Sequence, residues 1–131
     1  MNYSIVICYF ELVALVYLTC VLMGAPILTD LLRTLGFSIY LVSIGFLPMI
    51  MKTNGNIRQI FDKNLFSSLN SLERNLIYGT MIGAWLGAIP IPLDWDRWWQ
   101  RWPITCFVSS TFGAGLALII SYFNLLREKT K

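Results

Sequence analysis

The sequence predicts an all-α polytopic membrane protein, in which four helices cross the bilayer and a short Trp-rich interfacial link joins the third helix to the fourth. The first observation behind this prediction is composition. Of the 131 residues, 56% are hydrophobic and 13% charged, and the mean hydropathy is +0.64; soluble domains carry about 25% charged residues. So small a chain cannot hide that much apolar surface in its own core. Composition therefore argues against a soluble enzyme and a nucleic-acid-binding module.

The second observation is the presence of four apolar stretches, 5–23, 34–51, 75–92 and 103–126. Each has about 18–24 residues, the length with which a helix crosses a hydrocarbon core about 30 Å thick. Helices are expected because their backbone hydrogen bonds are satisfied internally in lipid. The whole chain is thus expected to form one membrane domain.

The connections between these stretches differ in character. Gly24-Ala25-Pro26 is expected to end the first helix, and Asp30 and Arg33 after it can pair at i, i+3. The next loop, 52–74, is polar and rich in Asn and Ser. Its apolar residues recur every three or four positions, which predicts a short amphipathic helix lying on the membrane. These residues are Ile57, Ile60, Phe61 and Leu65.

The distribution of Lys and Arg predicts the orientation. With four spans, the N-terminus, the 52–74 loop and the C-terminal tail share one side and hold seven of the ten basic residues. The other side holds Arg33, Arg97 and Arg101. Because cytosolic loops carry the excess of positive charge, both termini are expected in the cytosol. The Trp-rich link then faces the opposite side, which is the lumen of an internal membrane.

Glu11 is the charge inside the first apolar stretch. A carboxylate in lipid is costly and usually marks a function or a paired group. One interpretation is a proton-coupled binding group; the other is a carboxyl near the headgroup boundary that hydrogen-bonds a neighbouring helix.

Small residues recur at four-residue spacing in the last two stretches. Such residues let membrane helices approach closely. The pattern predicts that the two stretches pack on each other, or that this groove receives a helix of another subunit. The residues are Gly79, Gly83 and Gly87 in the third stretch and Ser109, Gly113 and Ala117 in the fourth.

The link between these stretches is the most distinctive segment. Pro90 and Pro92 are expected to end the preceding helix. Four tryptophans follow at i, i+3, i+4 and i+7, which predicts a half-helix lying flat, with its rings among the lipid headgroups and its charges toward water. They are Trp95, Trp98, Trp99 and Trp102; the polar residues between them are Asp94, Asp96, Arg97, Gln100 and Arg101.

No metal site or cofactor is expected. The sequence has no histidine and no CxxC pair, and Asp94 and Asp96 lack an evident third ligand. The three cysteines, Cys8, Cys20 and Cys106, are expected to be packing residues.

The segment from Gly83 to Arg97, followed by Trp99-Gln100 and Trp102-Pro103, resembles the signature of the PIG-F family of glycosylphosphatidylinositol (GPI) biosynthesis proteins. Gly24-Ala25-Pro26 after an apolar span also resembles a family feature, and the resemblance covers about residues 10 to 126. The chain departs from the family pattern in two ways: Trp98 stands where family members usually have Pro, and four spans are expected where they typically have about six.

The resemblance implies a non-catalytic accessory subunit in the endoplasmic reticulum. Family members accompany large ethanolamine phosphate transferases, which modify the GPI precursor. The implied partners are therefore such catalytic subunits and membrane lipid, and no nucleic acid. Two alternatives come from other classes. One is a small four-span transporter that exchanges protons through Glu11, and the other is a lipid-binding structural protein without a transferase partner.

Overall fold

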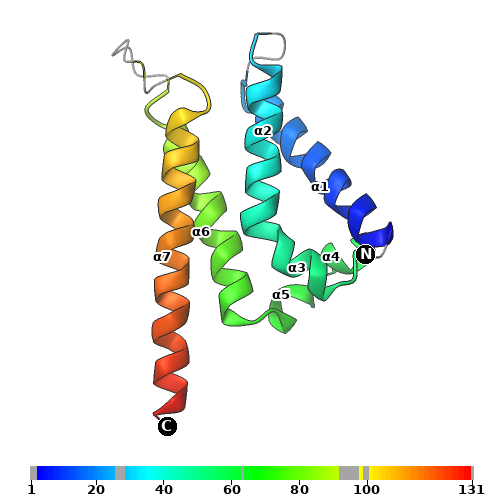
Figure 1. Cartoon of the computed structure of the whole chain (residues 1–131), viewed down its shortest axis with the longest axis vertical. Coiled ribbons are helices and arrows are strands. Elements are labelled where there is room, and N and C mark those ends of the chain that lie inside the picture. The colour runs from blue at the N-terminus through cyan, green and yellow to red at the C-terminus, as the bar shows by residue number, and fades with distance from the viewer. Residues whose placement is uncertain (1–2, 26–28, 63, 92–97, 99–100, 131) are drawn as a thin grey trace.

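The computed structural model describes residues 3–25, 29–62, 64–91, 98 and 101–130, and this part of the chain contains helices and no strands (Figure 1). The all-α prediction is confirmed. The elements are α1 (Tyr3–Leu22), α2 (Leu31–Leu41), the π-helical turn η1 (Val42–Phe46), α3 (Leu47–Lys52), α4 (Ile57–Ile60), α5 (Leu65–Ser68), α6 (Ser71–Ala88) and α7 (Ile104–Lys129).

The first helix ends at the predicted glycine. Gly24 has a φ of +101°. The backbone N–H of Ala25 donates to the Cys20 carbonyl and that of Gly24 to the Val21 carbonyl, both at 3.0 Å. These two bonds form a Schellman motif, in which a glycine in the left-handed region closes the helix. The expected Asp30–Arg33 pair follows, with 2.7 Å between the guanidinium and the carboxylate.

The second helical rod is continuous from α2 through η1 to α3. Pro48 has no N–H, and its ring crowds the carbonyl of Ile44 one turn earlier. A π-helical turn widens the helix at that position. There the rod approaches α6 closely, since a Cβ on Gly45 would lie 2.5 Å from the Thr80 Oγ1.

Figure 1 shows how the helices are arranged. α1 lies at one edge, the α2–η1–α3 rod lies in the middle, and α6 and α7 run side by side beyond it. The N-terminus, the segment carrying α4 and α5, and the C-terminus lie toward one end of the molecule. The α1–α2 and α6–α7 connections lie toward the other.

In the described part of the chain, three helices are long and apolar enough to cross a membrane: Tyr3–Leu22, Leu31–Lys52 and Ile104–Glu128. α6 is not among them, so the predicted fourth span is not established. The reason is local: α6 begins with Ser-Leu-Glu-Arg-Asn and ends at Ala88. From Leu76 onward its apolar part is therefore only about 20 Å long.

The 52–74 loop does not form the single amphipathic helix that was predicted, but two short helices, α4 and α5. Ile60 and Leu65 are buried in a cluster with Cys8 and Ile50, and Ile57 packs against that cluster. Phe61, in contrast, is 66% exposed. Lys52 ties this segment to its neighbours.

The Lys52 ammonium donates to the Ser68 carbonyl at 2.7 Å and to the Glu73 carboxylate at 3.0 Å. The same carboxylate accepts the backbone N–H of Asn70 at 2.9 Å, at the start of α6. These bonds join the end of α3 to both α5 and α6. They fix the position of α6 relative to the central rod.

Candidate functional site

The interface between α6 and α7 brings the predicted small residues together. A Cβ on Gly83 would lie 2.5 Å from the Ser109 carbonyl oxygen, and one on Gly87 would lie 2.6 Å from the Cα of Cys106. Since these neighbours are backbone atoms, they cannot move aside as a flexible side chain could. The glycines of α6 therefore face α7, and the helices approach at backbone distance.

The close approach continues toward the N-terminal part of α6. A Cβ on Gly79 of α6 would meet the backbone of Gly113 in α7 and lie 2.9 Å from the side chain of Ala117. Near the C-terminal part of α7, the Asn75 amide donates to the Ser121 hydroxyl at 3.0 Å. Ser121 in turn donates to the Ala117 carbonyl at 2.8 Å. The two helices are thus joined by close packing and by a partly buried polar contact.

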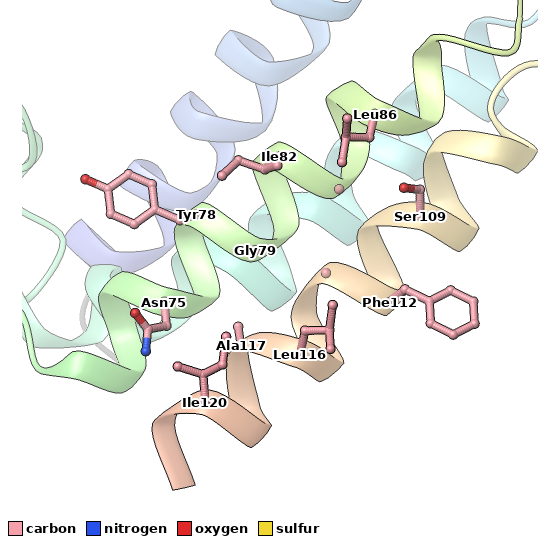
Figure 2. Close-up of a pocket in the computed structure, with 12 residues that line it drawn as sticks. Asn75, Tyr78, Gly79, Ile82, Leu86, Ser109, Phe112, Leu116, Ala117 and Ile120 are labelled. Atoms are coloured by element: carbon pink, nitrogen blue, oxygen red, sulfur yellow. The ribbon is translucent and has the colours of Figure 1, made fainter. Parts of the chain in front are cut away.

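An apolar groove of about 380 Å³ runs along the α6–α7 interface (Figure 2). Tyr78, Ile82 and Leu86 line it from α6, and Leu116 and Ile120 line it from α7. A second groove of similar volume continues toward the link and shares Leu86, Ser109 and Phe112 with the first. Pro90 lines this second groove.

Polar and aromatic contacts tie α2 to the start of α7. The Trp102 indole N–H donates to the Thr34 hydroxyl at 2.9 Å, and the Trp102 ring meets Phe37 edge-on at 5.7 Å. Further along the two helices, the Tyr40 hydroxyl of α2 lies 2.6 Å from the Thr111 hydroxyl of α7. We call these five residues the α2–α7 clamp. Sequence reasoning missed Thr34, Tyr40 and Thr111, although polar residues inside apolar spans were the available signal.

Trp102 differs from the expected stripe of outward-facing tryptophans. Residues 101–103 form a bend and a turn, so Trp102 does not continue a helix. Its ring is half-buried because the indole N–H needs an acceptor, and the fully buried Thr34 supplies one. Trp98, in contrast, is 73% exposed.

The rest of the link cannot be compared with the prediction. Arg101 is exposed, and Pro103 precedes α7. The remaining predicted link residues lie outside the described residues: Pro92, Asp94, Trp95, Asp96, Arg97, Trp99 and Gln100.

Glu11 is exposed on α1, beside the side that buries Cys8, Leu12 and Val13. It lines neither of the two grooves described above. A proton-coupled transporter needs its carboxylate in a cavity that the substrate can reach, and the position of Glu11 gives that alternative no support. The three cysteines are free, and no group of residues suited to hold a metal ion occurs in the described segments.

These features define a class: a helical membrane protein with apolar outer surfaces, whose polar side chains join its own helices. The chain belongs to the Pig-F family of GPI biosynthesis proteins, whose family model matches residues 1–122. The resemblance noted in the sequence is therefore confirmed. No solved structure matches this chain.

Several curated proteins are similar to this chain. The mouse (Mus musculus) protein named "GPI ethanolamine phosphate transferase, stabilizing subunit" is 38% identical over 120 residues, covering 88% of this chain and 54% of that protein. The human (Homo sapiens) protein of the same name is 41% identical over 106 residues, covering 77% and 48%. The "Glycosylphosphatidylinositol anchor biosynthesis protein 11" of Candida albicans is 40% identical over 119 residues, covering 82% and 44%. The chain thus spans about half the length of these relatives.

Proposed function

We propose that this chain is a non-catalytic, stabilising subunit of an ethanolamine phosphate transferase that acts in GPI-anchor biosynthesis at the endoplasmic reticulum. The observation that carries the proposal is the match, over most of this chain, to two proteins named as the stabilising subunit of that transferase. The phosphotransfer chemistry then belongs to the catalytic subunit.

The geometry supports an accessory role. Close packing between α6 and α7 and the α2–α7 clamp hold three long elements in a fixed arrangement. Their outer surfaces remain apolar over much of their length, as Phe112, Leu116 and Ile120 on α7 illustrate. A rigid set of apolar helices is suited to pack against the membrane helices of a larger enzyme.

We further propose that α6 crosses the membrane together with α7. The two helices lie side by side (Figure 1), and their contact extends from Asn75 and Ser121 to Gly87 and Cys106. The polar first turn of α6 would then lie among the headgroups on one side. The turn at 89–91 would bring the chain to the other side.

This topology puts both termini in the cytosol and the link in the lumen. It is supported by the seven basic residues of the N-terminus, the 52–74 loop and the tail, against three on the opposite side. In sealed vesicles with the cytosolic face outward, an impermeant thiol probe should label Ser67→Cys but spare Trp98→Cys. Labelling of Trp98→Cys from outside would contradict the topology.

The function is tested by affinity purification of the tagged chain from membranes, followed by mass spectrometry. The proposal predicts recovery of an ethanolamine phosphate transferase; recovery of the chain without any transferase would contradict it.

The link is proposed to brace the partner's lumenal domain or to shape lipid access to it. Asp94→Asn combined with Asp96→Asn separates the two roles. A persisting complex with failed transfer would show that the link does more than brace. Loss of the complex would indicate bracing.

A further inference from the structure

The outer face of α1 carries a carboxylate that the described part of the molecule does not pair. α1 contacts the rest of the protein through one side only, where Cys8, Leu12 and Val13 are buried. Glu11 is exposed at the edge of that side, one helical turn after Cys8. Among the described residues no hydrogen bond or ion pair involves its carboxylate.

The depth of Glu11 makes this exposure costly. It is the ninth residue of α1, so it lies roughly 12 Å from one end of the helix and roughly 16 Å from the other. α1 is one of the helices that can cross a membrane. A carboxylate at such a depth almost always faces the interior of a helix bundle, where another group pairs with it.

The residues around Glu11 form a continuous surface. Ile7 is 58% exposed and Leu18 is 57% exposed, and Ala14 between them is also exposed. With Glu11 these residues lie at i, i+4, i+7 and i+11, so they share one stripe of the helix. We call this stripe, formed by Ile7, Glu11, Ala14 and Leu18, the α1 outer face.

We propose that the α1 outer face packs in the membrane against a transmembrane helix of the transferase, which presents a basic or hydrogen-bond-donating side chain to Glu11. This proposal rests on the proposed function, because it takes the transferase as the partner. The chemistry of the partner's side chain follows from that of Glu11. A carboxylate in an apolar surface accepts hydrogen bonds, so the partner helix must present a donor to it.

Other occupants fit this face less well. Lipid chains offer no donor at the depth of Glu11. A second copy of the chain would bring two Glu11 carboxyls together, and they could pair only if at least one of them took up a proton. A helix with a donor satisfies the carboxyl, and Ala14 beside it leaves room for close approach.

The first experiment measures transferase co-purification with the full chain carrying Glu11→Leu or Glu11→Gln. We expect Glu11→Leu to lower recovery about three- to tenfold, the effect of one lost hydrogen bond between membrane helices. Glu11→Gln should retain most of the recovery because it keeps a hydrogen-bonding side chain of the same length. Glu128→Leu, the same change at an exposed position near the C-terminal end of α7, should recover the transferase like the wild type.

A second measurement guards against a folding defect. Glu11 makes no bond within the described part of the protein, so Glu11→Leu should melt at or above the wild-type temperature in detergent. A photocrosslinking residue at Leu18 should form an adduct of transferase mass, and one at Glu128 should not.

The outcomes separate this inference from the proposed function. If the wild type recovers the transferase but Glu11→Leu recovers equal amounts, the inference is overturned and the proposed function stands. An adduct of dimer mass, or adducts to lipid alone, would overturn it as well. Failure of the wild type to recover any transferase would overturn both.

Discussion

Adding one methyl group to the α6–α7 interface tests the packing described above. In Gly83→Ala, the new Cβ would lie 2.5 Å from the Ser109 carbonyl oxygen and 2.8 Å from the Cα of Ser110. Ordinary contacts begin near 3.4 Å, so the backbones must separate by about 0.9 Å or the helices must tilt. Gly115→Ala is the matched control, since nothing lies within 4 Å of the added Cβ.

The size of the effect follows from two opposing contributions. Overpacking of a well-packed interface costs about 1–3 kcal/mol. Replacing a helical glycine by alanine favours the helix by about 0.8–1.0 kcal/mol. The second contribution is common to both variants. The difference between the free energies of unfolding of Gly83→Ala and Gly115→Ala should therefore be about 1–3 kcal/mol.

Reversible unfolding of the purified protein in mixed detergent micelles, followed by circular dichroism, measures this difference. Gly83→Ala should unfold more readily than the wild type and Gly115→Ala no more readily. Equal stabilities of the two variants would refute the close approach of α6 and α7.

Three further predictions concern contacts that join other elements. Trp102→Phe should lower the free energy of unfolding by about 1 kcal/mol, and the loss should shrink in a Thr34→Val background, as a double-mutant cycle would measure. Tyr40→Phe should lower the free energy of unfolding by about 0.6 kcal/mol, the average for a hydrogen bond between membrane helices. In a Thr111→Val background, the same assay should show no further loss from Tyr40→Phe. Lys52→Met should speed proteolysis of the segment that carries α4 and α5. The free energy of unfolding should fall by at most about 1 kcal/mol, because the ion pair is partly exposed. An unchanged cleavage rate would contradict the role given to Lys52.

The parts of the fold that sequence predicted are those that depend on local composition. The helical class, the stop at Gly24 and the Asp30–Arg33 pair follow from apolar length, backbone conformation and spacing. The glycine spacing in α6 likewise pointed to close packing, although it left open which helix would fill it. In the structure it is α7 that packs against these glycines.

The parts that sequence did not predict depend on contacts between distant residues. Trp102 was assigned to an outward stripe by its spacing, yet Thr34, 68 positions away, accepts its N–H. Ile60 and Leu65 were assigned to a membrane-facing surface because their spacing is amphipathic. Spacing shows that a helix has an apolar side, but not whether that side contacts lipid or the rest of the protein. In this protein the two residues pack into the core beside Cys8.

The central claim is that this chain stabilises a transferase and takes no part in its chemistry. The most direct test follows the half-life of the transferase by pulse-chase labelling, with and without the chain, together with the activity per transferase molecule. The account predicts a shorter half-life without the chain and unchanged activity per remaining molecule. An unchanged half-life with lowered activity per molecule would contradict it.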